Sequence, residues 1–170
     1  MAVRELILLR HAKSDWAAPF TDDSDRPLNG RGREAAGVMG RVLALAGKTP
    51  DLVLSSPARR ALETAELAGT AGAWAARVVV DPRLSPGSPG AVIAAVRDRA
   101  GDAGRILVVG HEPAWSQTVS VLLGGGRVRM ATGTAASLGV SSWEELAPGA
   151  CALLWMLPPR LFTEGRFPLP

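Results

Sequence analysis

Cysteine is nearly absent from this sequence, since Cys151 is the only one among 170 residues. A single cysteine can form neither an internal disulfide bond nor a cysteine-rich metal site, so both are excluded within one chain. The residues that follow Cys151 are apolar. We therefore expect its side chain to be a small hydrophobic member of the core.

Long apolar runs are also missing. No segment approaches the roughly 18 consecutive apolar residues that a membrane-spanning helix requires, and the opening MAVRELILL carries charges at Arg4 and Glu5. Hydrophobic residues nevertheless make up 47% of the chain, which is enough for a sizeable core. We expect a soluble, unprocessed, cytoplasmic protein whose single domain spans residues 1–170.

A strong excess of charge of one sign is missing too. The isoelectric point is near 10.0, yet the formal net charge at pH 7 is only +3. The arginines are scattered among acidic residues, and neither a basic run nor an aromatic platform accompanies them. The sequence therefore favours neither a nucleic acid nor a membrane as a partner.

Short apolar strands alternate with helical patterns along the chain. The strand-like runs are continuously apolar, whereas the helical segments place apolar residues three and four positions apart. This alternation is typical of an α/β fold with a mostly parallel sheet and helices on both faces, a three-layer α/β/α sandwich. We expect strands near 4–10, 51–56, 77–81, 105–110, 133–140 and 150–157, helices at 30–47, from Pro57, at 90–100 and from Pro113, and a surface tail over 160–170.

Only two histidines occur in the chain, and each directly follows an apolar strand. His11 ends the stretch LILLRH, and His111 ends the stretch LVVGH. Because open α/β sheets bind ligands at the carboxyl ends of their strands, we expect the two imidazoles to share a site. A lone histidine is more often structural, but two at equivalent strand ends favour a catalytic pair.

Arginines lie near the same strand ends. Arg10 closes the first strand, and Ser56-Pro57 resembles the N-cap and first residue of a helix whose first turn holds Arg59 and Arg60. Helix N-termini and guanidinium groups both favour oxyanions, so phosphate is the expected ligand. We interpret Arg59 as a solvated surface charge. Arg26, in the polar loop before the first helix, either covers the site or is solvated.

Three motifs, in the same order, resemble those of the histidine phosphatase superfamily, the relatives of phosphoglycerate mutase. Arg10-His11-Ala12 is similar to the Arg-His-Gly signature, SSPARRALET to the Ser-Pro-x-x-Arg-Ala-x-x-Thr segment, and VVGHEP to the second-histidine motif. The short length and the stretch DSDRPLNGRG resemble the SixA-type phosphohistidine phosphatases. The resemblance spans about residues 6–113. It implies a phosphoglycerate mutase-like fold.

The resemblance also implies a role for each matching residue. His11 is the expected nucleophile, Arg10 and Arg60 are the expected phosphate ligands, and His111 is a further ligand or a proton-handling partner. No metal or other cofactor is implied, because the arginines supply the positive charge that a metal supplies elsewhere. Ala12 replaces the signature glycine, a change that the turn tolerates unless its backbone needs a positive φ angle.

A proton donor for the leaving group is missing from the place where related sequences can carry one. After the third strand, where relatives can have glutamate, this chain has Arg83. An alkoxide leaving group needs a proton donor more than an imidazole does, because the P–N bond of a phosphoramidate is already labile. The sequence therefore favours phosphohistidine in a phosphorylated protein as the substrate. Asp15, Asp25 and Glu112 remain as candidate donors.

Three other interpretations compete with this one. A small-molecule phosphomonoesterase of the same superfamily would use these residues on a phosphorylated metabolite, and a non-catalytic module would bind phosphate without turnover. A dinucleotide-binding domain fails, because Gly30-Arg31-Gly32 follows a polar loop and lacks the third glycine. Likewise, GGGR at 124–127 lacks the Lys-Ser/Thr end of a P-loop, and we expect a turn there.

Large aromatic side chains have two alternative places. Trp16, Phe20 and Trp115 either line a pocket near the histidines or pack in the core or at a loop base. Large aromatic residues in small domains more often do the latter.

Overall fold

A six-stranded sheet forms the centre of the structure, a computed structural model that describes residues 3–165, 167 and 169. The strand order is β3-β2-β4-β1-β5-β6, in which β3, β2, β4 and β1 run parallel while β5 and β6 each run antiparallel to the preceding neighbour. The expected mostly parallel sheet is therefore confirmed. The strands are β1 (Arg4–Arg10), β2 (Leu52–Ser55), β3 (Val78–Val80), β4 (Arg105–Gly110), β5 (Ala135–Val140) and β6 (Ala152–Leu157).

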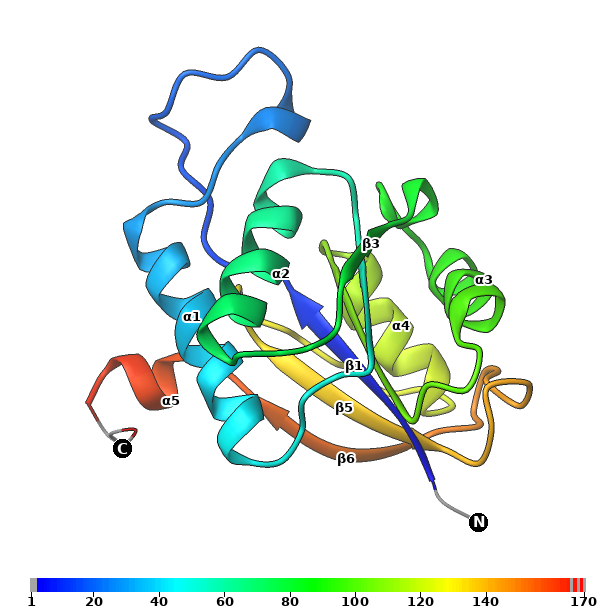
Figure 1. The fold of residues 1–170 in the computed structure, drawn as a ribbon. Helices are drawn as coiled ribbons and strands as arrows, with labels where there is room; N and C mark the ends of the chain where they lie inside the picture. Colours follow the sequence, from blue (N-terminus) through cyan, green and yellow to red (C-terminus); the bar gives the residue numbers. More distant parts are fainter. Residues whose placement is uncertain (1–2, 166, 168, 170) are drawn as a thin grey trace.

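Two pairs of helices cover the two faces of the sheet (Figure 1). Successive side chains of a strand point to opposite faces. In β1, Leu6 and Leu8 therefore pack on one side, with α3 (Pro89–Arg99) and α4 (Ala114–Leu122). Ile7 and Leu9 pack on the other, with α1 (Gly30–Leu45) and α2 (Arg59–Ala71). This is the expected three-layer α/β/α sandwich, and the continuous apolar run of β1 follows from burial on both faces.

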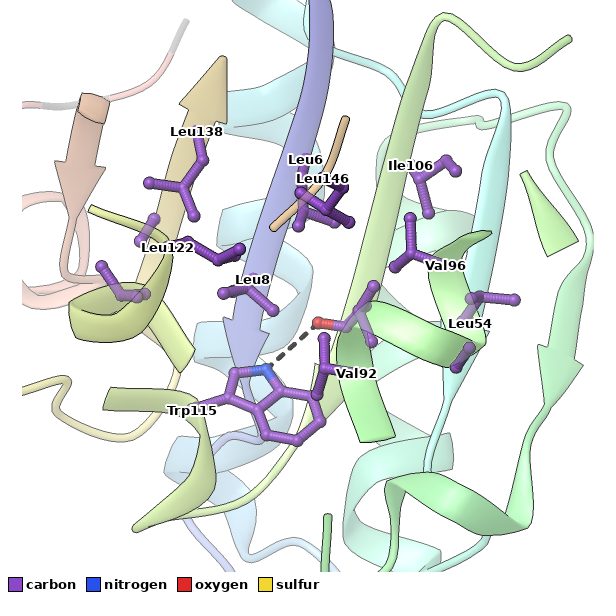
Figure 2. Packing of buried hydrophobic residues seen from close by; sticks show 14 of the residues in the cluster. Leu6, Leu8, Leu54, Val92, Val96, Ile106, Trp115, Leu122, Leu138 and Leu146 are labelled. Atoms are coloured by element: carbon purple, nitrogen blue, oxygen red, sulfur yellow. Dashed lines mark hydrogen bonds between the residues drawn. The ribbon is translucent and has the colours of Figure 1, made fainter. Parts of the chain in front are cut away.

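Trp115 belongs to the core of the α3–α4 face. Its ring is fully buried, and its indole Nε1 donates a hydrogen bond to the Val108 carbonyl oxygen at 3.3 Å. Figure 2 shows this bond, with the side chains of Leu8 and Val92 close to the ring. Trp115 was expected either to line a pocket near the histidines or to pack in the core, and the structure shows that it packs in the core.

The start of α2 differs from the expected one. Ser56 and Pro57 were the expected cap and first helical residue, but Ala58 is the N-cap and the helix begins at Arg59. The Ser56 hydroxyl accepts a hydrogen bond from the N–H of Ala58 at 3.3 Å within the preceding turn. The same hydroxyl contacts the ring of His111 at 2.6 Å, a contact between distant parts of the chain that a local cap signal does not contain.

The start of α1 fits closely against the loop that follows β1. The N-cap Asn29 accepts a hydrogen bond from the N–H of Gly32 at 2.8 Å and donates its own N–H to the carbonyl oxygen of Lys13 at 3.0 Å. A Cβ atom at Gly32 would lie only 2.1 Å from that same Lys13 oxygen. The glycine in this helix start therefore serves close packing against the loop, in agreement with the rejection of a dinucleotide fingerprint.

The C-terminal tail lies only partly on the surface. It contains a short helix, α5 (Arg160–Thr163), and Phe162 packs, half-buried, against the cluster under α1 and α2. Positions 166, 168 and 170 of the expected surface tail lie outside the described residues. Apolar burial of Phe162 explains why the tail folds back onto the domain.

Cys151 lies at the edge of the core. Its side chain is half-buried against the cluster on the α3–α4 face, and burial raises the pKa of its thiol to about 11. The expectation of a small hydrophobic residue thus holds at the periphery of the core. Among the described residues, no helix combines the length and apolar content needed to cross a membrane.

Candidate active site

The two histidines lie side by side at the carboxyl ends of neighbouring strands. β1 and β4 pair in parallel, and their last residues, Arg10 and Gly110, lie opposite each other. The residue that follows each strand is a histidine. The ring centroids of His11 and His111 are 5.3 Å apart, with an angle of 55° between the planes. Both residues are buried. The structure therefore brings together two side chains that are 100 positions apart in the sequence.

One ring nitrogen of His11 has a fixed partner. Its Nδ1 lies 2.7 Å from the carbonyl oxygen of Ala12. A carbonyl oxygen can only accept, so Nδ1 carries the proton and Nε2 of the neutral ring keeps its lone pair. Burial is the main cause that lowers the pKa of His11 to about 3. The hydrogen bond to Ala12 raises this pKa, whereas the positive charges of His111, Arg60 and Arg10 lower it further. At neutral pH, Nε2 is therefore available as a nucleophile.

Helix α2 holds the loop that carries His11. The N–H of Ala12 donates to Thr64 Oγ1 at 3.0 Å, and this hydroxyl donates to the carbonyl oxygen of Arg60 at 2.7 Å. Among the described residues, Ala73 is the non-glycine residue with a positive φ angle, so Ala12 has an ordinary backbone conformation. Alanine in place of the signature glycine therefore fits this turn without strain.

His111 has a hydroxyl partner that sequence reasoning missed. Its Nε2 lies 2.6 Å from Ser56 Oγ, and Ser56 is fully buried. Burial first, and the positive charge of Arg60 second, lower the pKa of His111 to about 4, so the ring is neutral at pH 7. The hydroxyl of Ser56 accepts from the N–H of Ala58, and the His111 ring is its only acceptor among the described residues, so we assign its proton to the bond with Nε2. The proton of the neutral His111 ring then lies on Nδ1. In the sequence, Ser56 offered only the signal of a helix cap.

A cavity of about 410 Å³ opens beside the two rings. Arg10, Arg26 and Arg60 lie along its wall, whereas Arg59 points away and pairs with Glu63 at 2.9 Å. The structure thus separates the two consecutive arginines of α2 and brings Arg26 into the site. Also in the lining are His11, Lys13, Ser14, Trp16, His111, Glu112 and Thr132.

Several N–H donors at this cavity have no partner among the described residues. Arg10 Nε, Arg60 Nε and His111 Nδ1 are buried and make no hydrogen bond, although Arg10 Nη1 donates to the Met130 carbonyl oxygen at 2.7 Å. These three nitrogens are closed to solvent, so it is the parts of the same side chains bordering the cavity that are open to an oxyanion, a strong acceptor for guanidinium and imidazole N–H groups. The arrangement is therefore suited to binding a phosphoryl group between the arginines and the histidines.

Asp23 is an acidic residue of the site that sequence reasoning also missed. Its carboxylate lies 2.9 Å from Arg60 Nη2 and 2.9 Å from Arg26 Nη2, and its carbonyl oxygen accepts from Arg60 Nη1 at 2.6 Å. Burial is the largest single influence and raises the pKa of this carboxyl, but the hydrogen bonds and charges of the two arginines together outweigh it and lower the pKa below its usual value. Asp23 thereby holds two mutually repelling cations next to each other. Three aspartates lie in this stretch, and no feature of the sequence distinguishes Asp23 from the other two.

The three candidate proton donors lie in different surroundings. Glu112 borders the cavity, and its Oε1 accepts the N–H of Ser116 at 3.1 Å. Asp15 accepts the N–H groups of Ala17 and Ala18 at 2.9 Å and 3.2 Å, and it does not line the cavity. Asp25 lines a separate hollow, together with Arg59 and Glu63. Of the three, Glu112 is the one beside the site.

Arg83 lies outside the cavity. Its guanidinium group donates to Asp81 at 2.7 Å and to Asp98 at 2.5 Å, so these two carboxylates hold it on the α3 side of the molecule. Within the part of the chain that the structure describes, no three His, Cys, Asp or Glu side chains are grouped so that they could hold a metal ion. The charged groups at the cavity are therefore its arginines, Lys13, Asp23 and Glu112.

Comparison with known proteins agrees with this geometry. The model of the histidine phosphatase superfamily (branch 1) matches residues 6–91. An uncharacterized protein of Mycobacterium tuberculosis is 34% identical over 163 residues, which cover 89% of this chain and 100% of that protein. Solved structures show the same fold over nearly the whole chain. A protein assigned as the phosphohistidine phosphatase SixA in Nakamurella multipartitia has a TM-score of 0.83 and 28% identity, covering 94% of this chain and 98% of its own.

A second solved structure is the protein histidine phosphatase SixA complexed with tungstate. Its TM-score is 0.80 at 26% identity, with 91% of this chain and 97% of that chain covered. The matched family model, the relative and the two structures together show that this chain belongs to the histidine phosphatase superfamily, branch 1.

Proposed function

We propose that this chain is a metal-independent phosphatase that removes phosphate from phosphohistidine in proteins through a phosphohistidine intermediate on His11. The observation that carries the proposal is the neutral ring of His11. Its Nδ1 proton is bound to the Ala12 carbonyl oxygen, and its remaining nitrogen lies in a pocket bordered by arginines. A neutral nitrogen nucleophile beside a set of cations suits attack on a phosphoryl group.

In the first step, the lone pair of His11 Nε2 attacks phosphorus opposite the leaving group. A P–N bond to His11 forms as the substrate's P–N bond breaks, and the electron pair of the broken bond returns to the substrate imidazole. This nitrogen is basic and takes a proton readily from water. The position of Arg83, held away from the cavity by Asp81 and Asp98, is compatible with a leaving group that needs little acid assistance.

The arginines stabilise the transferring phosphoryl group. Arg10, Arg60 and His111 line the cavity beside His11 and carry guanidinium and imidazole N–H donors. These donors stabilise the charge on the equatorial phosphoryl oxygens, which is greatest in the transition state. The positive charges of the two arginines also help to keep the pKa of His11 low. Their loss is therefore expected to slow turnover as well as to weaken binding.

In the second step, water attacks the phosphorus of phosphorylated His11. The P–N bond breaks, Nε2 recovers its lone pair, and inorganic phosphate leaves with the oxygen of the water. The SixA structures support phosphohistidine as the substrate, because they match 91% and 94% of the chain at 26% and 28% identity. One of them holds tungstate, a tetrahedral oxyanion like phosphate.

Acid-free trapping of the intermediate tests the chemistry. Purified protein is mixed with a peptide carrying radiolabelled phosphohistidine, denatured in alkali after a short time, and separated from the peptide. We expect a base-stable, acid-labile label on the wild-type protein and no label on His11→Ala. A label of the same amount on both proteins would remove His11 from its role. Arg59→Ala, whose side chain points away from the cavity, is the control that keeps the label.

A substrate panel tests the specificity. The specificity constant for phosphohistidine peptides is compared with that for phosphate esters of small metabolites. A preference for one ester by orders of magnitude would instead identify a small-molecule phosphatase of the same superfamily. Binding of inorganic phosphate without hydrolysis of any substrate, at any pH, would identify a non-catalytic module.

A further inference from the structure

Trp16 is an exposed aromatic residue at the mouth of the candidate active site. It is 73% exposed, which is far more than is usual for a large aromatic side chain, and it is part of the lining of the cavity that holds His11. The loop around it is well fixed. Asp15 accepts the N–H groups of the two residues after Trp16, and the N–H of Asp15 donates to the Pro27 carbonyl oxygen at 2.8 Å.

The indole ring is stacked on a cation. Arg26 Cζ lies 3.7 Å from the ring centroid, and the Phe20 ring is inclined by 69° to the indole at a centroid distance of 6.4 Å. Arg26 is itself fixed, because it donates to Asp23 at 3.0 Å and to Ser14. A ring held on one face by a fixed cation, with most of its surface exposed, presents its other face to solvent. The indole ring is thus already ordered before a ligand binds, so binding does not lose free energy by immobilising it.

Trp16 differs from the rest of the cavity lining. Most of the other side chains there are charged or polar, and Trp16 supplies the large flat apolar surface. The site thus has an anion-binding end and a flat end, joined by Arg26, which contacts both Trp16 and the carboxylate that neutralises Arg60. A molecule that fits both ends carries a phosphoryl group attached to a planar unsaturated ring.

We infer that the exposed face of Trp16 is a binding subsite for the planar ring that carries the phosphoryl group, namely the imidazole of phosphohistidine. Stacking on the indole holds the ring while the P–N bond is cleaved. This inference rests on the proposed function and adds a residue that distinguishes ring-bearing phosphoryl donors from those without a ring. Offset stacking of two aromatic rings contributes an amount that corresponds to about tenfold in affinity at its upper range.

Binding of stable analogues tests the subsite without catalysis. The affinity of (imidazolylmethyl)phosphonate, which has a ring, is compared with that of methylphosphonate, which has none, by titration calorimetry. In the wild type we expect the ring-bearing ligand to bind about tenfold more tightly. In Trp16→Ala this ratio is expected to fall close to one while the affinity for methylphosphonate is retained, and Trp16→Phe is expected to restore most of the ratio.

Two results would overturn the inference. One is a ratio that is the same in wild type and Trp16→Ala. The other is an equal loss of both affinities in Trp16→Ala, which would mean that the ring only supports Arg26. Failure of the proposed function looks different, since it gives a Trp16-dependent ratio together with no hydrolysis of phosphohistidine peptides.

Discussion

His11 and His111 share a residue type and a neighbourhood, but their ring nitrogens have different partners. His11 Nδ1 contacts a carbonyl oxygen, which fixes its proton and leaves Nε2 free. His111 Nε2 contacts the hydroxyl of Ser56, which assigns the ring proton to Nδ1. One ring is thereby prepared to attack and the other to donate a hydrogen bond to an oxyanion. The surrounding hydrogen bonds, more than the residue type, divide the roles.

Removal of the Ser56 hydroxyl tests this division. In Ser56→Ala, His111 loses the donor to Nε2, so its proton is free to move from Nδ1 to Nε2. We expect turnover of a phosphohistidine peptide to fall about tenfold, the size of one buried hydrogen bond, while the fold is kept. Nitrogen NMR of histidine-labelled protein shows the protonated nitrogen directly, and it is simple here because the chain has two histidines.

Ser55 provides the matched control for Ser56. It is also a fully buried serine, but its hydroxyl donates to the Ser56 carbonyl oxygen at 2.9 Å and has no contact with His111. Ser55→Ala is expected to leave the tautomer of His111 unchanged. If Ser56→Ala also leaves both the tautomer and the turnover unchanged, Ser56 does not position the ring.

The consecutive arginines of α2 allow a second comparison. Arg60 borders the cavity and is mostly buried, whereas Arg59 is exposed and paired with Glu63. Arg60→Ala removes a charged donor to the phosphoryl group and is expected to lower kcat/KM about a thousandfold. Arg59→Ala is expected to change it by less than about twofold, because exposed ion pairs contribute little. Steady-state kinetics with a phosphohistidine peptide measures both, and similar effects of the two variants would contradict the assignment.

At the scale of elements, the site depends on how α1 meets the loop after β1. Gly32→Ala places a Cβ atom 2.1 Å from the Lys13 carbonyl oxygen, and backbone must move to relieve the clash. We expect the free energy of unfolding to fall by about 2 kcal/mol, as for other overpacked positions. Turnover is expected to fall with it, because Lys13 lies two residues after His11. Chemical denaturation and peptide hydrolysis measure the two effects.

Gly30 is the control in the same helix, since a Cβ atom there meets nothing within 4 Å. Gly30→Ala is expected to leave the free energy of unfolding within about 0.5 kcal/mol of the wild type, and alanine has the higher helix propensity. An equal loss of stability in both variants would contradict the contact with the loop as the cause, because helix propensity favours alanine at both positions.

The sequence predicts well those helices and strands in which apolar residues follow a clear pattern. The buried run of β1 and the helix starting at Gly30 lie where their patterns place them, because burial on both faces or on one helical face dictates the residue types. The predicted start of α2 at Pro57 is wrong by two residues, because the helix begins at Arg59. The cap signal of Ser56 is local, whereas its hydrogen bond joins residues 55 positions apart.

The same limit applies to the candidate site. The histidines and Arg60 are marked by their positions at strand and helix ends. Asp23 is not marked, because its two arginine partners come together only when the loop folds over α2. Trp16 is equally ambiguous in the sequence, because residue type alone does not show whether a tryptophan is exposed or buried. Contacts made by loops depend on tertiary structure, which periodicity does not encode.

For the whole molecule, the strand order places the chemistry. β4 lies between β1 and β2, so the turns after β1, β2 and β4 meet at the end of the sheet where these parallel strands have their carboxyl ends. The loop ahead of α1 extends from that same end (Figure 1). Four of the 19 Lys and Arg side chains thus line one cavity, in a molecule whose formal net charge is only +3. Burial of two imidazoles next to these cations has a consequence for stability, because the folded state resists their protonation.

The stability of the whole protein is therefore expected to fall in mild acid. The pKa values of His11 and His111 in the folded protein are about 3 and about 4, against about 6.5 in an unfolded chain. As pH falls below 6.5, the unfolded state binds protons that the folded state does not, so the free energy of unfolding decreases. Each histidine contributes a loss of about 1.4 kcal/mol per pH unit in this range, or about 2 kcal/mol by pH 5.

Denaturation by urea at about pH 7.5 and about pH 5 measures this loss, with His11→Asn as the comparison. Asparagine does not titrate, so the variant is expected to lose about 2 kcal/mol less than the wild type between the two pH values. The carboxylates near the site, including Asp23 with its lowered pKa, are present in both proteins and contribute equally to first order. The same loss in wild type and variant would mean that His11 is protonated as easily in the folded protein as in the unfolded chain. A nucleophile kept neutral by burial would then be ruled out.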